Sequence, residues 1–490
     1  MKSSWSEEDA RAAVRRYADD PRVNEDIALR VYSSRLIGQD PALVLHGGGN
    51  TSVKTRLRDD TGEEVAVLCV KGSGWGLGDI EPEGLPAVRL DGLSVLRERD
   101  ALSDEEMVNA QRTRLLTASA PNPSVETLLH AFLPHKFVDH SHADAILALV
   151  DQPDAEALCR ELYGTRLGIV PYVMPGFALS KLAAETYEKN PEVEGLLLLR
   201  HGLFTFGRTA KESYERHIRA VDEAERFAKK KREKARVERV ARAQLDYEAI
   251  APSLRGRLGQ GERRYVLCLR QSEAIDAFLA RADLPEVSQR GPATPDHVIR
   301  TKRVPLLLEI SSDDDAEQRS AHIEAQLAAY REAYAAYVAR EAAAKGRLVT
   351  QLDPDPRIIL VPGLGLIAAG SSRKAANVAA DIYEHTISVI EAAEAIGRYE
   401  VLGTDDLFDM EYWSLEQAKL GKTSDAPLVG HVVLVTGGAG TLGLATAQAF
   451  QAEGAEVAIL DRDADAVAAQ AAQHGFLGLA CDVTDPAAMC

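Results

Sequence analysis

Cysteine is scarce in this chain, because only five cysteines occur among 490 residues. They are widely spaced and form no C-x-x-C pair, which argues against a disulfide framework and against a cysteine-ligated zinc site. Aromatic residues are also few, at 6%. No run approaches the roughly 20 apolar residues that span a bilayer, and the charged amino terminus lacks the apolar core of a signal peptide. These absences predict a reducing, cytoplasmic location and no membrane partner.

Positive charge is in deficit as well. The chain has 57 Lys and Arg against 75 Asp and Glu, for a formal net charge of -18 at pH 7. Such a charge argues against a nucleic-acid partner. The apolar fraction of 46% and charged fraction of 27% are typical of a globular protein with full cores. An anionic substrate would therefore need a local cluster of donors, such as a glycine-rich loop or a helix N-terminus.

Composition divides the chain into three regions, which we predict to be domains: residues 1–240, 245–420 and 428–490. At about 100–200 residues per domain, the length suits three domains. A polar linker, GKTSDAP, joins the second region to the third. The first region alternates glycine-punctuated apolar runs with helices and closes with a long charged helix. Residues at helical spacing mark the buried face of that helix: Tyr214, Ile218, Val221 and Ala224.

Three histidines of the first region indicate a metal site. His140 and His142 form an H-x-H pair in KFVDHSHADAILALV, which we interpret as a buried strand. Alternate residues of a strand face the same side, so the two rings should be adjacent. His201 ends a second apolar strand, GLLLLRHG. Three neutral imidazoles and an open fourth position make a catalytic zinc arrangement; the alternative is a set of hydrogen-bonded core histidines.

A carboxylate stands close to the H-x-H pair in the sequence. Glu126 lies in NPSVETLLHAFLP, which predicts a helix start with Ser124 as the N-cap. The carboxylate could simply stabilise the helix dipole. If the helix packs beside the H-x-H strand, Glu126 could instead act on substrate as a general acid/base. His130, one turn further on, is either a packed helix residue or a functional one.

Two glycine-rich loops predict an anion pocket. One is HGGGNTS at residues 46–52, and the other is KGSGWGLG at residues 71–78. Consecutive glycines expose backbone N–H groups, which form a nest for phosphate oxygens. Either loop alone could be a tight turn. Together with Ser124, near a zinc site, they favour a phosphate pocket.

The second region loosely repeats the end of the first. A strand, a glycine turn and a helix are expected from HGLFTFG with YERHIRAVDEAE, and again from PGLGLIAAG with YEHTISVIEAAE. Pro362 would then stand where His201 stands in the first copy. If the copies are related, the second has lost this ligand and cannot hold the same metal.

The third region opens with a nucleotide-binding pattern. A strand and a glycine turn in VVLVTGGAGTLG match G-x-G-x-x-G at Gly438, Gly440 and Gly443. Asp461 ends the following strand, where an acidic residue favours NAD over NADP. The region is too short for a doubly wound sheet, and the chain holds no Tyr-x-x-x-Lys. We therefore expect no dehydrogenase activity and poor order in this piece, and a longer natural protein.

Taken in order, GGGNTS, KGSG, PSVE, the H-x-H pair and LLLLRHGLFTFG resemble the class II aldolase/adducin family over roughly residues 25–230. The fuller arrangement is similar to bifunctional aldolase/short-chain dehydrogenases of the rhamnulose-1-phosphate aldolase/lactaldehyde dehydrogenase type. The resemblance implies an α/β fold. It would have a class II aldolase-like central β-sheet flanked by helices, a degenerate second aldolase-like region, and the first part of a Rossmann domain.

The resemblance also implies roles for matching residues. The zinc ligands would be His140, His142 and His201, and Glu126 would be the catalytic acid/base. The residues that would help to hold the substrate phosphate are Asn50, Ser52, Gly72, Ser73 and Ser124. In the dehydrogenase region, Asp482 and Val483 would contact the adenine of NAD. The family often takes a tyrosine from a neighbouring subunit, for which Tyr163 is a candidate, and the resemblance suggests a homo-tetramer.

The implied activity is zinc-dependent cleavage of a phosphorylated sugar. A deoxy-ketose 1-phosphate, such as rhamnulose 1-phosphate, would give dihydroxyacetone phosphate and lactaldehyde. The same fold and metal would also serve a sugar-phosphate 4-epimerase, which recombines the cleaved halves. A non-catalytic, adducin-like module is a third alternative, although such a module has no need of an open metal site.

Overall fold

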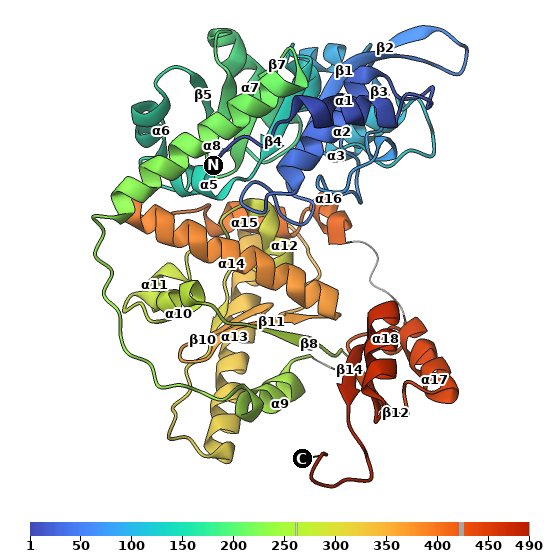
Figure 1. Ribbon diagram of the computed structural model, residues 1–490. Coiled ribbons are helices and arrows are strands. Elements are labelled where there is room, and N and C mark those ends of the chain that lie inside the picture. The colour runs from blue at the N-terminus through green and yellow to red at the C-terminus, as the bar shows by residue number, and fades with distance from the viewer. Residues whose placement is uncertain (260, 262, 421–425, 490) are drawn as a thin grey trace. The chain divides into compact units, whose positions relative to one another are not determined.

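The computed structural model describes residues 1–259, 261, 263–420 and 426–489 (Figure 1). Five residues of the expected linker, 421–425, lie outside the described residues, as does Cys490. The four described cysteines are unpaired. Within the described part of the chain, no helix is both long and apolar enough to cross a membrane.

The chain forms two compact units that do not follow chain order. Unit 1 consists of Met1–Val237, Arg290–Ile299 and His385–Lys419. Unit 2 consists of Glu238–Gln289, Arg300–Glu384 and Leu420–Cys490. Two short segments of the second sequence region therefore belong to the same unit as the first region.

Unit 1 is built on a seven-stranded sheet in the order β3-β2-β1-β4-β7-β6-β5. Its strands are β1 (Asn50–Arg58), β2 (Glu64–Val70), β3 (Ala87–Arg89), β4 (Phe137–Ser141), β5 (Leu167–Val170), β6 (Gly195–Leu198) and β7 (Gly202–Gly207). Neighbouring strands are antiparallel, except that β5 and β6 are parallel.

Helices cover both faces of this sheet. Those wholly in unit 1 are α1 (Glu7–Arg16), α2 (Glu25–Gly38), α3 (Asp104–Arg112), α4 (Thr127–Phe132), α5 (Asp144–Val150), α6 (Ala155–Tyr163), α7 (Phe177–Lys189), α8 (Ala210–Arg232), α15 (Thr404–Glu411) and α16 (Ser414–Gln417). Helix α2 packs on β1 and β4, and helix α8 packs beside it on β4 and β7. Apolar side chains of α4 and α7 pack against β4, β6 and β7 on the other face.

The long helix α8 follows its expected pattern. Thr209 is its N-cap, and the Thr209 side chain accepts a hydrogen bond from the backbone N–H of Glu212. All four residues of the predicted apolar face are buried. The expected strand over residues 136–150 is wrong in its second half, because α5 begins at Asp144. The apolar run after the H-x-H pair forms a helix. Periodicity alone does not distinguish a helix from a strand in so short an apolar segment.

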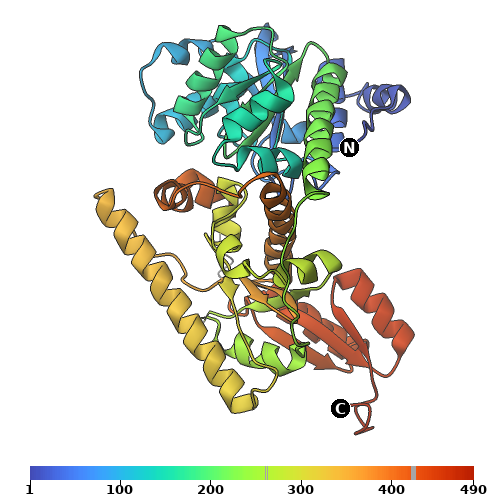
Figure 2. The ribbon, with the colours of Figure 1, turned by 90° about the vertical axis from the view of Figure 1, so that its left-hand side faces the viewer.

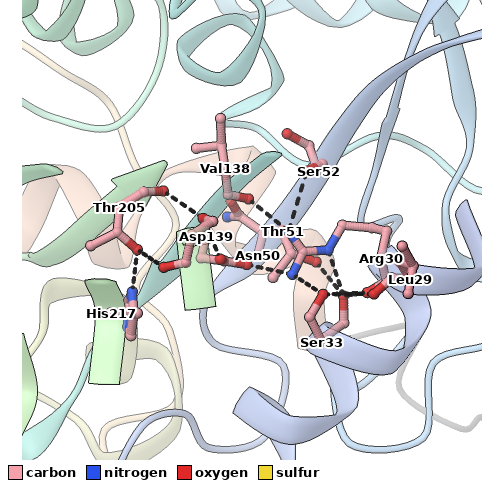
Figure 3. Close-up of polar contacts among 12 residues, drawn as sticks. Leu29, Arg30, Ser33, Asn50, Thr51, Ser52, Val138, Asp139, Thr205 and His217 are labelled. Atoms are coloured by element: carbon pink, nitrogen blue, oxygen red, sulfur yellow. Dashed lines mark hydrogen bonds and ion pairs between the residues drawn. The ribbon is translucent and has the colours of Figure 1, made fainter. Parts of the chain in front are cut away.

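A buried polar network ties β1 and β4 to α2 (Figure 3). Arg30 and Asp139 form an ion pair at 2.5 Å, with both side chains fully buried. The Arg30 guanidinium also donates to the carbonyl oxygens of Ser52 and Val138, and Ser213 donates to Asp139. Removing one partner of such a pair costs about 3–5 kcal/mol. Since Asp139 and His140 point to opposite faces of β4, this network holds in place the strand that carries His140.

Unit 2 contains a four-stranded sheet in the order β8-β11-β10-β9. Its strands are β8 (Val266–Arg270), β9 (Leu306–Leu307), β10 (Ile358–Val361) and β11 (Gly365–Gly370). The helices here are α9 (Tyr247–Arg257), α10 (Glu273–Leu279), α11 (Leu284–Val287) and α13 (Ala316–Ala344), while α12 (Val298–Thr301) and α14 (Arg373–Ile396) each run from one unit into the other. Helix α13, the long yellow helix of Figure 2, packs on α9.

The four-stranded sheet repeats the topology of β4-β7-β6-β5. In both sheets the first two pairs are antiparallel and the last pair is parallel. Strand register corrects one expectation. Leu198 pairs with Gly202, and Val361 pairs with Gly365, across turns of equal length. The counterpart of His201 is therefore Leu364, and Pro362 opens the turn instead.

The dehydrogenase region forms a parallel sheet in the order β12-β13-β14. Its elements are β12 (Val432–Thr436), α17 (Thr441–Ala452), β13 (Glu456–Asp461), α18 (Ala464–His474) and β14 (Leu477–Ala480). Apolar side chains of the strands and both helices share one cluster. The expectation of poor order stays a prediction, and part of the apolar surface of β12 and β14 is exposed in this structure.

Candidate metal and substrate site

Three imidazoles meet at one end of β4 and β7. One ring nitrogen from each of His140, His142 and His201 lies within 4.8 Å of the others. The Nε2 atoms of His140 and His142 are 3.1 Å apart. His140 lies on β4, whereas His142 lies just beyond the end of that strand and His201 lies in the turn between β6 and β7. The expected position of His142 on the strand is thus wrong by one residue.

The backbone around the three rings leaves no room for larger residues. A Cβ atom at Gly202 would lie 2.5 Å from the carbonyl oxygen of Ser141 and 3.1 Å from the His142 ring. Gly49 has a φ of +60°, and a Cβ atom there would lie 2.6 Å from the carbonyl oxygen of His140. Only glycine fits both close approaches. These glycines let β1 and β7 approach the histidines directly.

The histidines are in the right state to bind a metal. Burial lowers the pKa of His201 to about 4 and that of His142 well below its usual value. Both rings are therefore neutral near pH 7, as a ligand must be. Nδ1 of His140 lies 3.0 Å from the carbonyl oxygen of Leu203. A carbonyl accepts only, so Nδ1 carries the proton and Nε2 presents its lone pair.

Glu126 lies beside two of these nitrogens. Its carboxylate oxygens are 3.4 Å from Nε2 of His140 and 3.5 Å from Nε2 of His201. Burial raises the pKa of Glu126, but its contacts, which include a hydrogen bond from Asn50, outweigh burial and lower the pKa below its usual value. Oε1 accepts no hydrogen bond from the described residues. An ionised carboxylate with a bare oxygen therefore faces the histidine cluster.

The helix that follows Glu126 starts later than expected. Glu126 itself is the N-cap position of α4, and its side chain makes no capping hydrogen bond. Ser124 is not the cap; its hydroxyl accepts from the backbone N–H of Glu126 instead. The structure does not support the alternative in which the Glu126 carboxylate only stabilises the helix dipole. The carboxylate points to Asn50 and the histidines instead.

His130 proves to be a supporting residue. Its Nδ1 lies 2.7 Å from the Ser52 hydroxyl, and its Nε2 bonds the amide oxygen of Asn50. With that oxygen engaged, the Asn50 amide N–H group donates to Glu126 at 2.6 Å. Burial lowers the pKa of His130 to about 3, so the ring is neutral. Ser52 and His130 thus orient Asn50, which in turn orients Glu126, and the Ser52 side chain is fully buried.

In the second glycine-rich loop, two backbone N–H groups form hydrogen bonds within the protein and are not free to join a nest. The N–H of Gly72 donates to Gly84, and that of Ser73 donates to Asn122. A Cβ atom at Gly72 would lie 2.7 Å from the Pro121 ring, so this glycine permits close packing. The N–H of Gly72 is therefore not free to donate to a phosphate in this structure. The Ser73 residue remains exposed.

Lys71 is a site residue that sequence reasoning missed. The backbone N–H of Ser124 donates to the Lys71 carbonyl, and the Lys71 ammonium donates to the carbonyl of Gly47 at 3.0 Å. Burial lowers the pKa of Lys71 to about 8. The group is still mostly protonated at pH 7 and places a cation between both glycine-rich loops and Ser124. A lysine directly before the glycines was the available signal.

Tyr163 does not reach any site. Its side chain is buried, and its hydroxyl donates to the carbonyl of Ala220 at 2.7 Å. The interpretation of this residue as a tyrosine offered to a neighbouring subunit is wrong. Its amphipathic helix α6 directs the ring into the interior of unit 1 instead.

The predicted NAD-binding residues gather at one edge of the third sheet. Parallel strands present their carboxyl ends at the same edge. Gly438 follows β12, Asp461 ends β13, and Asp482 and Val483 follow β14. A Cβ atom at Gly443 would lie 2.0 Å from the carbonyl oxygen of Gly437, so only glycine allows α17 to begin so close to the turn. Gly440 is the N-cap residue of α17.

Comparison with known families defines the class of protein. Residues 30–227 match the class II aldolase and adducin N-terminal domain, and residues 245–420 match the second domain of class II aldolases. Residues 431–490 match the short chain dehydrogenases. The domains are thus those of a class II aldolase joined to a short chain dehydrogenase segment. The chain belongs to the class II aldolase/adducin family.

Several individual proteins are similar to this chain. A Bacillus subtilis (strain 168) protein named uncharacterized oxidoreductase YuxG is 35% identical over 441 residues, which are 88% of this chain and 63% of that protein. This chain therefore spans less than two thirds of that relative. The cis-2,3-dihydrobiphenyl-2,3-diol dehydrogenase of Paraburkholderia xenovorans (strain LB400) is 48% identical over 58 residues, 11% of this chain and 21% of that protein. The N-terminal class II aldolase domain of a conserved protein from Thermoplasma acidophilum is 43% identical, with 46% of this chain and 99% of that chain covered and a TM-score of 0.41.

Proposed function

We propose that unit 1 is a zinc-dependent aldolase, a carbon–carbon lyase that acts on a deoxy-ketose 1-phosphate. Rhamnulose 1-phosphate is the substrate that we favour, with dihydroxyacetone phosphate and lactaldehyde as products. One observation carries the proposal: three clustered imidazoles and the bare oxygen of Glu126 lie side by side. A site of that kind is suited to lyase chemistry at a carbonyl, and a purely structural module does not need it.

The residues present fit a zinc ion. His140, His142 and His201 would hold it, since neutral imidazoles are preferred zinc ligands and three of them leave a position open. When bound, zinc supplies a Lewis acid that polarises a substrate carbonyl. The chain itself supplies the proton chemistry. Glu126 is ionised and can take or return a proton at the substrate carbon, while Asn50 holds its other oxygen in place.

A phosphate group would be held on the side of the glycine-rich loops. Of the residues predicted for this role, Asn50, Ser73 and Ser124 remain candidates, and we add the Lys71 ammonium. Ser52 and Gly72 act indirectly, since one orients His130 and the other allows close packing. A buried cation near hydrogen-bond donors favours an anionic group over a neutral one.

The dehydrogenase segment supports a second half of the proposal. Gly438, Gly440 and Gly443 would approach the pyrophosphate of NAD, and Asp461 would accept from its ribose hydroxyls. An aldehyde released by the first reaction is a substrate class that such a dehydrogenase could oxidise. Oxidation requires the remainder of a dehydrogenase domain, so in this chain we assign only the nucleotide-binding start to residues 431–490.

The test is a screen of the zinc-loaded chain against phosphorylated ketoses, with dihydroxyacetone phosphate and free aldehyde measured separately. We expect equal amounts of both products from one or more deoxy-ketose 1-phosphates, and none with His140→Ala. An epimeric sugar phosphate without free aldehyde would identify a 4-epimerase instead. Full cleavage by His140→Ala would refute the proposed site.

A further inference from the structure

Residues 290–299 lie in the second aldolase region of the sequence but belong to unit 1. They include a short 3-10 helix, η3 (Pro295–His297), and they bring two polar side chains to the far side of the His142 ring. Oγ1 of Thr294 lies 3.4 Å from Nδ1 of His142, and Oδ1 of Asp296 lies 3.5 Å from the same nitrogen. The Thr294 hydroxyl also forms a hydrogen bond with Asp296.

The chemistry of these groups sets the direction of each hydrogen bond. The Thr294 hydroxyl donates to a carboxylate oxygen of Asp296, which is the acceptor of this bond. The Thr294 oxygen then has only lone pairs to offer His142. Nδ1 of His142 must therefore carry the proton, and Nε2 is left bare toward the Nε2 atom of His140.

We propose that Thr294 and Asp296 form a positioning relay for His142, so that the metal site of the first aldolase region depends on residues supplied by the second. Neither residue reaches the reacting atoms; both act through the ring they orient. Histidine ligands commonly donate their other ring N–H to a carboxylate or a similar acceptor, which fixes the tautomer and the ring orientation. The relay gives His142 what the Leu203 carbonyl gives His140.

The relay rests on the proposed function, because it assumes that His142 binds a metal. It also explains a feature of the fold. Thr294 is almost fully buried at 1% exposure, although most short connecting segments lie at the surface. Thr294 and Asp296 both contact the His142 imidazole, and these contacts attach the segment to unit 1.

The experiment measures zinc affinity rather than activity. Thr294→Val removes the hydroxyl and keeps the shape, and Asp296→Asn removes the charge. We expect each variant to bind zinc about 10- to 100-fold more weakly, as measured by competition with a chromophoric chelator. The cobalt-loaded variants should also show an altered visible absorption spectrum. Thr294→Ser keeps the hydroxyl and should bind as the parent does.

Folding is checked by tryptophan fluorescence, since Trp5, Trp75 and Trp413 all belong to unit 1. The comparison of Thr294→Val with Thr294→Ser tests the relay even where Asp296→Asn destabilises the fold. Unchanged zinc affinity and an unchanged cobalt spectrum in Thr294→Val would overturn the relay and leave the proposed function intact. A parent protein that binds no zinc would overturn both.

Discussion

Two sheets of this protein share a topology, yet they differ at every position that could bind a metal. The first is β4-β7-β6-β5 of unit 1, and the second is β8-β11-β10-β9 of unit 2. Strand β4 and helix α5 have the same lengths and spacing as β8 and α10. The strand registers therefore align His140 with Leu269, His142 with Gln271, and His201 with Leu364.

The second sheet closes the equivalent turn without a metal. The amide N–H of Gln271 donates to the carbonyl oxygen of Leu364 at 2.7 Å. One hydrogen bond thus joins the two segments that the proposed ion joins in unit 1. Strand order and turn length are the same in both cases, so neither of them creates the site. The difference lies in three side chains placed on an otherwise similar backbone.

The largest effect should come from making the first sheet resemble the second at one position. His201→Leu introduces the residue found at the equivalent turn and removes one ligand. We expect cleavage to fall at least about a thousand-fold, because the metal contributes several kcal/mol and each 1.4 kcal/mol is a factor of ten. The rate of dihydroxyacetone phosphate release measures this. Cleavage within a few-fold of the parent would show that His201 is not a ligand.

A second variant separates the metal from the proton chemistry. Glu126→Gln keeps the shape and the contact with Asn50 but cannot exchange a proton at neutral pH. We expect turnover to fall about 10²- to 10⁴-fold while the chain still binds zinc. Turnover and zinc content are to be measured on the same sample. A rate close to that of the parent would leave Glu126 without a catalytic role.

The comparison can also be reversed by rebuilding the lost site. The triple variant Leu269→His, Gln271→His and Leu364→His places three imidazoles on the second sheet. If the two turns are equivalent, zinc content should rise from one ion per chain to two, with cleavage unchanged. Zinc is counted by elemental analysis after dialysis. A content that stays at one ion would mean that the two turns differ in ways that register does not reveal.

A smaller effect concerns acid stability of unit 1. His130 has a pKa of about 3 when folded and about 6.5 when unfolded. As the pH falls, His130 gains a proton in the unfolded chain before it does so in the folded chain. The stabilising contribution of the neutral His130 ring is therefore complete above pH 6.5 and is lost as the pH falls toward 3. In His130→Asn, the free energy of unfolding should depend on pH less steeply in that window, by up to about 1.4 kcal/mol per pH unit. Denaturant titrations followed by tryptophan fluorescence measure it, and identical slopes would contradict the assignment.

Much of the site could be predicted from the sequence, because its parts sit in short local patterns. The H-x-H pair, the histidine before Gly202 and the carboxylate of PSVE can each be recognised from a few neighbouring residues. A bare functional carboxylate and three clustered imidazoles are the arrangement that those patterns favoured. The nucleotide-binding glycines followed from the same kind of local signal.

Other features depend on contacts across long stretches of chain. Thr294 and Asp296 lie more than a hundred residues from His142, and no local pattern links them to it. The hydrogen bond from the Gly72 N–H to the carbonyl oxygen of Gly84 is a tertiary contact as well. Matching the two sequence segments residue by residue makes Pro362 the counterpart of His201. Strand register shows instead that Leu364 is the counterpart. Sequence reasoning found the three histidines and Glu126, and it missed residues that reach them from distant parts of the chain.

The most direct test of the account is the X-ray absorption spectrum of zinc bound to the unaltered chain. Three imidazole nitrogens and one oxygen neighbour should surround the ion, with zinc–nitrogen distances of about 2.0–2.1 Å. His201→Leu should show no such shell. Sulfur neighbours, or a zinc ion surrounded by oxygen alone, would contradict the claim that these three histidines share one metal.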